Sequence, residues 1–154
     1  MEGYVRAQWQ APAGVYGLTT TRLGPGVSVA PFDRFNLGDH VGDDPLAVAA
    51  NRVALGREYA LPAAPLWLRQ VHGAGVIDAD TVAIGDVPTA DAVISRSPDR
   101  VLAILTADCL PVLFAADDGS VIGAAHAGWR GLAAGVLEAT VAAMQGDPAR
   151  LVAW

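Results

Sequence analysis

A run of short apolar segments with no helix between them constrains the fold of this chain more than any other feature. The segments are rich in Val, Ile, Leu and Ala and are bounded by Gly, Pro, Asp or Ser, as strands buried on both faces typically are. They cover residues 75–80, 90–95, 101–106, 111–116 and 121–127. Because parallel neighbours need a long crossover connection, strands that follow one another so closely cannot all be parallel. The pattern therefore predicts a mixed β-sheet.

Two helices are predicted beside this sheet. Asp44 supplies an N-cap and Pro45 stands at the first helical position, so a helix is expected from residue 45 to about 59. Its apolar stripe is predicted to be Leu46, Ala49, Ala50 and Val53. A second helix is predicted over 128–146, ended by Gly146 and Pro148. Its apolar stripe is predicted to be Leu132, Val136, Leu137, Val141 and Met144.

The remaining segments complete the expected architecture. Residues 14–21 and 65–73 are strand-like, residues 151–154 begin another strand, and the long segment 22–43 is a loop of the kind that often carries function. No linker divides residues 1–154. The sequence therefore predicts an α/β (α+β) fold: a single-domain layered sandwich of mixed β-sheets with flanking helices.

The composition excludes several classes of protein. The formal net charge is -6 and every basic residue is arginine, which offers no electrostatic footprint for nucleic acid or an anionic membrane. A single cysteine cannot form an internal disulfide, so a disulfide-stapled secreted domain is excluded. No apolar run reaches the length needed to span a membrane, and the first residues lack the basic region followed by an apolar stretch that is typical of a secretory leader. We expect a cytoplasmic protein, and the sequence leaves its oligomeric state open.

Three metal-competent side chains stand at expected strand ends. His72 and His126 each come just before a glycine, and Cys109 lies where two predicted strands break. Taken singly, each is more often a structural residue than a ligand. At three strand ends they can converge on one edge of a sheet, where two histidines and one cysteine suit a zinc ion with an open fourth position. The spacings of 37 and 17 residues between them match no zinc finger.

Six sequence blocks carry a resemblance to a known family. They are "NLGDHVGDDP", "NR" at 51–52, "LRQVHG", "ADAVIS", "TADCLPVLF" and "HAGWRG". In this order they resemble the signature blocks of the bacterial multicopper polyphenol oxidase, or laccase-domain, family. Its members are described as zinc-dependent purine nucleoside phosphorylases with adenosine deaminase and methylthioadenosine phosphorylase activity, and are linked to peptidoglycan editing. The resemblance implies that His72, Cys109 and His126 are zinc ligands.

The resemblance covers the chain from about residue 14 to residue 154. Family members continue for roughly another third of a domain beyond the position of Trp154. Together with the apolar strand at the very end of the chain, this implies that the C-terminal part of the family domain is missing. Part of the sheet and of the substrate pocket would then be missing as well.

The implied activity is zinc-dependent phosphorolysis of adenosine, inosine, guanosine and methylthioadenosine, with deamination of adenosine. The substrates are then a purine nucleoside and phosphate. A zinc-activated water would serve deamination, whereas phosphorolysis needs phosphate held beneath C1′. Arg130, in the first turn of the predicted helix 128–146, is the candidate for phosphate binding, with a structural ion pair as the alternative.

Further candidate site residues come from the same blocks and from the loop 22–43. Asp108 is expected either to orient a ligand histidine, to act as acid or base, or to accept backbone N–H groups in the turn before Pro111. His40 is a candidate for catalysis. The candidates for substrate binding are Asn36, Arg52, Gln70 and Asp91. Each of these also has a plain structural explanation in a turn, a loop or at a strand end.

Three other functions fit the same residues. A metal-free cysteine hydrolase acting on peptidoglycan precursors would use Cys109 as nucleophile and His72 or His126 as base. A copper-dependent polyphenol oxidase is less favoured, because a blue-copper site prefers an axial Met, the only methionines are Met1 and Met144, and a multicopper enzyme needs more than three histidines. A domain that binds a partner without turnover is the third alternative.

Overall fold

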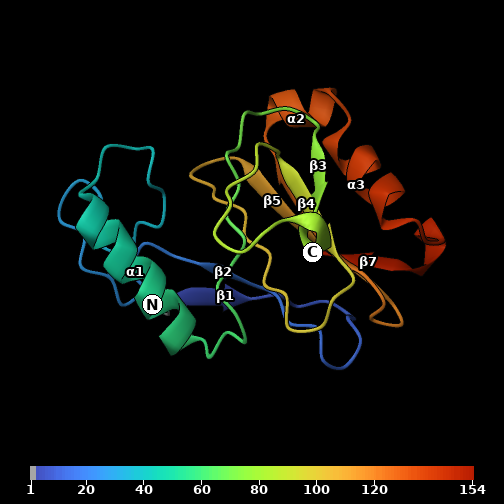
Figure 1. Cartoon of the computed structure of the whole chain (residues 1–154), viewed down its shortest axis with the longest axis horizontal. Helices are drawn as coiled ribbons and strands as arrows, with labels where there is room; N and C mark the ends of the chain where they lie inside the picture. The colour runs from blue at the N-terminus through green and yellow to red at the C-terminus, as the bar shows by residue number, and fades with distance from the viewer. Residues whose placement is uncertain (1–2) are drawn as a thin grey trace. The chain divides into compact units, whose positions relative to one another are not determined.

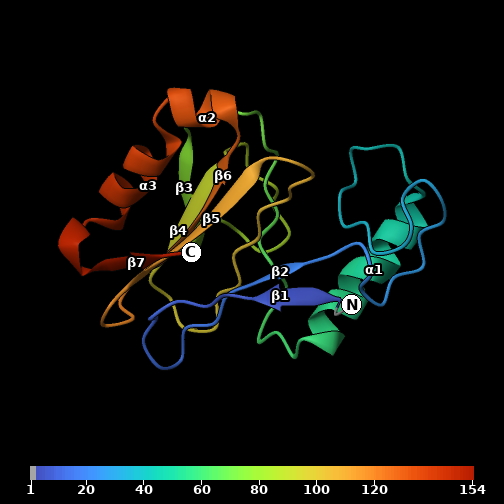
Figure 2. The same cartoon turned by 180° about the vertical axis from the view of Figure 1, so that it is seen from behind.

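The structure, a computed structural model, describes residues 3–154, and these gather into two compact units (Figures 1 and 2). The first unit contains the residues up to Ala7 together with Gly17–Ala64. The second contains Gln8–Tyr16 and Pro65–Trp154. The sequence predicts one domain without a linker, whereas the contacts divide the chain into these two units.

The first unit pairs a small hairpin with one helix. Strand β1 (Tyr4–Arg6), which the sequence pattern does not predict, runs antiparallel to β2 (Leu18–Thr20), which lies within the predicted strand 14–21. Helix α1 (Pro45–Glu58) begins where expected, because the side chain of Asp44 accepts a hydrogen bond from the backbone N–H of Leu46. The predicted helix from 45 to about 59 is confirmed.

The predicted apolar stripe of α1 is wrong. Leu46 and Val53 are 79% and 71% exposed, and the residues that α1 buries are Val48, Asn51 and Leu55. The buried face is set by hydrogen bonds rather than by apolar spacing. Asn51, fully buried, accepts from the backbone N–H of Val27 at 2.8 Å and donates to the carbonyl of Asn36 at 2.8 Å. The helix thereby holds the irregular loop 22–43, which is confirmed as a loop.

The second unit is built on a five-stranded sheet of order β3-β4-β6-β5-β7. Its strands are β3 (Val76–Asp78), β4 (Ala92–Ser95), β5 (Leu110–Ala116), β6 (Ile122–Ala127) and β7 (Leu151–Ala153). β3 and β4 are parallel, and every other neighbouring pair is antiparallel. The mixed sheet predicted from the sequence is confirmed, and the predicted strand at 151–154 forms one of its edges.

The predicted continuous helix over 128–146 is wrong. The segment forms two helices, α2 (Trp129–Ala133) and α3 (Val136–Met144), separated at Gly135, whose φ of 86° is in the left-handed region that favours glycine. This break lets α3 lie on the sheet with Val136 and Met144 buried, whereas Leu132 of the predicted stripe stays 42% exposed on α2. Across residues 3–154, the helices lack the combination of length and apolar character that crossing a bilayer requires.

The two faces of the sheet are covered differently. Ala92 and Ile94 of β4 belong to a buried cluster with Met144 of α3, whereas Val93 between them belongs to a cluster with Leu66 on the opposite face. This alternation follows from the period of two in a strand. Figure 2 shows α3 along one side of the sheet. Leu66 and Leu102, which come from segments outside the sheet, pack on the opposite face.

Two predicted strands form this second covering layer instead of joining the sheet. Residues 65–73 and 101–106 are in contact through a single bridge, Leu66 to Leu102, so the prediction that they are strands is wrong. The side chain of Gln70 strengthens their contact: its amide donates to the carbonyl of Leu105 and accepts from the N–H of Leu105, both at 2.7 Å. An apolar segment that covers a sheet has the same composition as one that pairs within it.

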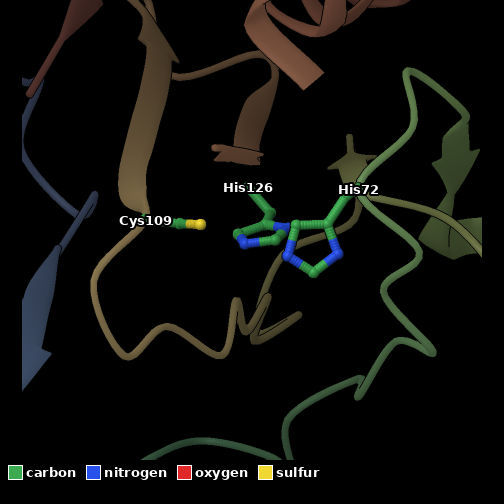
Figure 3. A group of neighbouring side chains, drawn as sticks. All are labelled: His72, Cys109 and His126. Carbon is green, nitrogen blue, oxygen red and sulfur yellow. The ribbon is translucent and has the colours of Figure 1, made fainter. Parts of the chain in front are cut away.

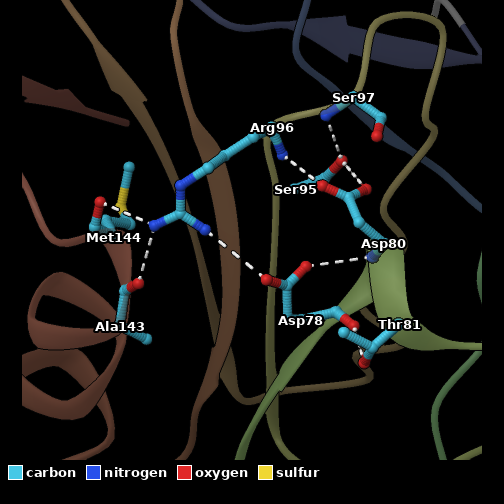
Figure 4. A network of polar contacts seen from close by, with 8 residues as sticks. All are labelled: Asp78, Asp80, Thr81, Ser95, Arg96, Ser97, Ala143 and Met144. Atoms are coloured by element: carbon cyan, nitrogen blue, oxygen red, sulfur yellow. Dashed lines mark hydrogen bonds and ion pairs between the residues drawn. The ribbon is translucent and has the colours of Figure 1, made fainter.

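A polar network closes the end of β4 that lies opposite to Asp91 (Figure 4). The carboxylate of Asp80 accepts from the hydroxyl of Ser95 at 2.6 Å and from the backbone N–H of Arg96 at 2.8 Å. The guanidinium of Arg96 donates to the carbonyls of Ala143 and Met144, both at 3.0 Å, and so caps the C-terminal end of α3. The network joins β3, β4 and α3.

Asp80→Asn is expected to lower the free energy of unfolding at neutral pH and to make it less dependent on pH in acid. Burial raises the pKa of Asp80, but hydrogen bonds from Ser95 and Arg96 outweigh it and hold the pKa below its usual value. The stabilisation is therefore present above the unfolded pKa of about 4 and is lost as the pH falls through the lower folded pKa. Urea unfolding of both proteins at several pH values measures this. A difference in stability that stays constant down to about pH 2 would contradict it.

Candidate metal centre

Four segments of the second unit meet at one end of the strands of the five-stranded sheet, where β3, β4 and β5 begin and β6 ends. β6 is antiparallel to both β4 and β5, so its last residues lie beside the first residues of those two strands. β3 is parallel to β4 and therefore begins at the same edge. His126 is near the end of β6, while His72, Asp91 and Cys109 come just before β3, β4 and β5. The convergence of His72, Cys109 and His126, predicted from their positions, is confirmed.

The three side chains point toward one another (Figure 3). One ligand atom from each, an imidazole nitrogen of His72 and of His126 and the Sγ of Cys109, lies within 4.8 Å of the others. The two imidazole rings are edge to face, with centroids 4.8 Å apart. His126 is 3% exposed, Cys109 is half-buried and His72 is exposed, so the cluster opens to solvent on one side.

This donor set fits a zinc ion. Zinc–nitrogen bonds of about 2.0–2.1 Å and zinc–sulfur bonds of about 2.3 Å place the ligands of a tetrahedral ion about 3.5 Å apart. The three donor atoms lie within 4.8 Å of one another, so a shift of about 1 Å in each side chain brings them to that spacing. Among residues 3–154, this is the one group of three or more His, Cys, Asp or Glu side chains close enough to hold a metal.

Asp91 lies behind the cluster and is fully buried. Its Oδ1 is 2.9 Å from Nδ1 of His126, and its backbone carbonyl accepts from the N–H of His126 at 2.7 Å. Burial raises the pKa of Asp91, but hydrogen bonds from His126 and from the backbone of residues 71–73 outweigh it, so the pKa lies below its ordinary value. Asp91 is therefore ionised at neutral pH and only accepts hydrogen bonds, which requires Nδ1 of His126 to be the donor.

His72 does not end a strand, contrary to the prediction. It lies in a tight bend with a φ of 61°, which is unusual for any residue other than glycine. The N–H of His72 donates to Asp91 Oδ1 at 2.8 Å, and the N–H groups of Val71 and Gly73 donate to Asp91 Oδ2 at 3.1 and 2.8 Å. These bonds compensate for the unfavourable backbone conformation, which turns the imidazole toward the cluster.

The chain passes so close to Cys109 that any side chain at residue 128 would displace the Cys109 sulfur. A Cβ built on Gly128 would lie 2.6 Å from Sγ of Cys109 and 3.7 Å from Cδ2 of His72. The hydroxyl of Thr106 donates to the carbonyl of Cys109, closing the turn that carries the cysteine. Sequence analysis missed both features, because a close approach between distant segments leaves no local pattern.

Two other predicted site residues lie near the cluster in sequence. Asp108 is exposed, and within residues 3–154 its carboxylate makes no hydrogen bond or ion pair. The carboxylate within hydrogen-bonding distance of a histidine of the cluster is that of Asp91, not that of Asp108. Arg130 is exposed on α2, where its guanidinium stacks on the ring of Trp129, 4.9 Å from the centroid. Catalytic roles for Asp108 and Arg130 stay predictions.

Three predicted site residues belong to the first unit. The amide of Asn36 donates to the carboxylate of Asp43 at 2.9 Å, and Arg52 donates to the carbonyl of Leu37 at 2.9 Å. His40 is largely exposed, with Nδ1 3.7 Å from a carboxylate oxygen of the neighbouring residue. Their roles in substrate binding and catalysis stay predictions, as does that of Gln70, whose amide is bonded to Leu105. The substrate contact predicted for Asp91 is untested, and its burial favours a different role.

Comparison with known proteins adds an independent finding. Residues 17–154 match the family described as multi-copper polyphenol oxidoreductase laccase. A purine nucleoside phosphorylase of Xylella fastidiosa is 55% identical over 96% of this chain, and the purine nucleoside phosphorylase YfiH of Escherichia coli is 46% identical over 100% of this chain. The crystal structure of the Neisseria meningitidis protein NMB0706 superposes with a TM-score of 0.91, at 45% identity over 98% of this chain.

This chain is shorter than these relatives. It spans 60% of the Xylella protein, 63% of the Escherichia coli protein and 61% of the Neisseria chain. The match extends through both units, because it covers nearly all of this chain in each case.

Proposed function

The chain belongs to the family described as multi-copper polyphenol oxidoreductase laccase, and from that premise we propose that it carries the metal centre of a zinc-dependent purine nucleoside phosphorylase. The observation that carries the proposal is the meeting of His72, Cys109 and His126 within 4.8 Å. The printed names of the relatives from Xylella fastidiosa and Escherichia coli support the reaction. The proposed substrates are a purine nucleoside and phosphate.

Zinc is proposed as the metal because of the donors and their surroundings. Two imidazoles and one thiolate suit zinc, and the openness of the cluster at His72 leaves access for a substrate. When bound, zinc supplies a Lewis acid in a site that also admits solvent. The chain's own residues position the ligands. Asp91 is hydrogen-bonded to the ring of His126 and to the backbone N–H of His72, and Thr106 closes the turn that carries Cys109.

Phosphorolysis exchanges one bond at C1′ of the ribose for another. The bond from C1′ to the purine nitrogen breaks with its electron pair passing to the base, and a phosphate oxygen forms the new bond to C1′. The purine then takes up a proton. Arg130 is the proposed phosphate ligand, because it lies on α2 four residues after His126, and its exposed guanidinium stacks on Trp129 with its N–H groups available.

Deamination of adenosine is the proposed second reaction of the same site. Water adds at C6 of the adenine ring and ammonia leaves, so a group must take up a proton from the water and pass one to the leaving nitrogen. Asp108 is the proposed group, since its exposed carboxylate adjoins Cys109 in sequence and is not committed to another residue.

One experiment tests both reactions. Purified protein with a measured zinc content is incubated with adenosine, with and without phosphate, and adenine, inosine and hypoxanthine are separated by chromatography. Adenine that appears only with phosphate supports phosphorolysis, and inosine formed without phosphate supports deamination. Zinc-loaded protein that forms none of the three products would contradict the proposal.

The description of the family favours a second candidate, copper-dependent oxidation of phenols. The residues support it less well. Met144, the one methionine among residues 3–154, is 2% exposed and packs with its sulfur near Gly123 at the far end of β6 from His126, so it is no axial ligand for the cluster. Oxidation of a phenol by copper-loaded protein, absent with zinc, would favour this candidate over the first.

Arg130→Ala is expected to raise the KM for phosphate about 10- to 100-fold, the range for losing a charged hydrogen bond, with little change in the KM for adenosine. Steady-state rates at varied phosphate measure this. Arg150→Ala is the matched control, because it also removes a guanidinium. Arg150 is paired with Asp117, which follows β5, whereas Cys109 of the cluster precedes β5. An unchanged KM for phosphate in Arg130→Ala would show that Arg130 does not bind phosphate.

A further inference from the structure

We propose that Asp91 is a positioning residue that holds both histidines of the metal centre with a single carboxylate. Its Oδ1 is bonded at once to the ring of His126 and to the backbone N–H of His72. The inference rests on the metal site of the proposed function and is independent of which nucleoside the protein uses. It extends that function by naming what prepares the two imidazoles for a metal ion.

The bond to His126 selects the tautomer of its ring. The two oxygens of Asp91 accept three backbone N–H groups, as a carboxylate does, so Nδ1 of His126 is the donor across the 2.9 Å to Oδ1. Nε2 is then unprotonated and presents its lone pair on the other side of the ring. A histidine that binds a metal through one nitrogen usually donates its other N–H in this manner, which fixes the ring and raises its basicity.

The bonds to the bend at residues 71–73 place His72. Three successive N–H groups, those of Val71, His72 and Gly73, all donate to the two oxygens of Asp91. They hold His72 in its left-handed backbone conformation, which an L residue adopts only where its surroundings require it. Without the carboxylate, three partly buried N–H groups lose their acceptor, and nothing holds the bend at residues 71–73 in place.

The sheet itself keeps Asp91 in register with His126. Asp91 immediately precedes β4, and its backbone carbonyl accepts the N–H of His126 at 2.7 Å as the ladder between β4 and β6 begins. The side chain is fully buried, so water does not compete for its oxygens. Backbone and side chain of one residue thus hold the same histidine from two directions.

Asp91→Asn is the sharpest substitution, because it keeps the shape and replaces one acceptor by a donor. If the amide oxygen faces His126, the new NH2 group meets the N–H groups of Val71 and Gly73, and the bend that carries His72 opens. If the amide is turned over, its NH2 faces Nδ1 of His126 and favours the tautomer with the proton on Nε2, so that Nε2 has no lone pair for a metal ion. Either orientation damages one of the two histidines.

The experiment measures zinc affinity and the His126 tautomer in separate samples. Zinc affinity is obtained by competition with a chromophoric chelator for wild type, Asp91→Asn and the control Asp80→Asn. The control removes another hydrogen-bonded carboxylate, at the opposite end of β4. The tautomer is read from two-bond 15N–1H correlations of zinc-free, 15N-labelled protein at pH 8, with the His126 signals identified by comparison with His72→Ala and His40→Ala.

Asp91→Asn is expected to bind zinc about 10- to 100-fold more weakly than wild type, the range for losing a hydrogen-bonding partner of a metal ligand, while Asp80→Asn stays within about twofold. Wild-type His126 is expected to carry its proton on Nδ1. In Asp91→Asn this preference is lost only if the amide NH2 faces Nδ1, and it is kept, with the bend at residues 71–73 opened, if the amide oxygen faces Nδ1. Zinc affinity in Asp91→Asn within about twofold of wild type would overturn the inference. A proton on Nε2 of His126 in the wild type would also overturn the inference. That measurement uses wild-type protein alone and does not depend on the folding of a variant.

Failure of this inference is distinguishable from failure of the proposed function. A wild-type protein that binds zinc with the expected tautomer but releases no base from nucleosides refutes the phosphorylase proposal and leaves the role of Asp91 intact. A protein that performs phosphorolysis, and whose Asp91→Asn variant keeps its zinc, refutes the role of Asp91 alone. A merely structural role is also separable, because lost folding stability would not change the tautomer of a ring in folded protein.

Discussion

Replacing Cys109 with serine is expected to reduce the zinc content from about one ion per chain to almost none and to lower the rate of phosphorolysis more than about 100-fold. Even the loss of a residue that only supports a metal ligand costs about 10- to 100-fold, and Cys109 is one of three donors within 4.8 Å. A serine hydroxyl at this position remains protonated at neutral pH and is a poor ligand for zinc. Two imidazoles are then left to hold the ion.

Zinc content by inductively coupled plasma mass spectrometry and nucleoside turnover measure this result. The folded state is expected to survive, because Cys109 is half-buried in a turn that Thr106 closes through the backbone. Chelation of zinc from the wild type provides the matched chemical control, and readdition of zinc restores activity. Full activity in metal-free wild type, together with its loss in Cys109→Ser, would point to a cysteine nucleophile and contradict the metal centre.

The second large effect is expected from Gly128→Ala, which adds one methyl group and removes no donor. Its Cβ would lie 2.6 Å from Sγ of Cys109, about 1 Å inside ordinary contact, so the sulfur must move away from the cluster. In metal-free protein this is easy, because the cysteine can rotate about one bond. With a metal bound, the same rotation breaks a ligand bond. Gly128→Ala is therefore expected to bind zinc about 100-fold more weakly while unfolding at nearly the same temperature.

Gly146→Ala is the matched control. A Cβ there meets nothing within 4 Å and Gly146 is outside the left-handed region, so the same chemical change leaves zinc binding at the wild-type value. Chelator competition and thermal unfolding are measured on all three proteins. Gly128→Ala that binds zinc as tightly as Gly146→Ala would show that the sulfur is not constrained as the structure describes.

The sequence pattern located most strands and failed where an apolar segment covers the sheet. Segments 75–80, 90–95 and 121–127 contain β3, β4 and β6, and 111–116 covers all of β5 except its first residue, whereas 65–73 and 101–106 join no sheet. Burial imposes the same apolar composition on a strand inside a sheet and on an extended segment lying over it. Which of the two forms depends on hydrogen-bond partners far away in the sequence.

Helix predictions show the same limit at a finer scale. Asp44 and Pro45 mark the start of α1 through local hydrogen bonding and geometry, and the start is confirmed. The buried face of α1 follows from Asn51, whose partners come from the loop 22–43, so spacing alone selected the wrong stripe. Gly135 is tolerated within a helical pattern, and only packing of α3 on the sheet explains why the helix breaks there.

By itself, the sequence determined the chemistry available to the centre: two imidazoles and one thiol, each at the boundary of an apolar segment, together with a sheet that cannot be wholly parallel. The tertiary structure alone decided how these groups are supported. It placed Asp91 rather than Asp108 against His126, turned His72 inward through a bend, and left room for nothing larger than Gly128 beside the sulfur. Residue types and local patterns can be read from the sequence. Hydrogen-bond partners, and the space between residues such as Gly128 and Cys109, depend on strand register, which exists only when distant segments have packed together.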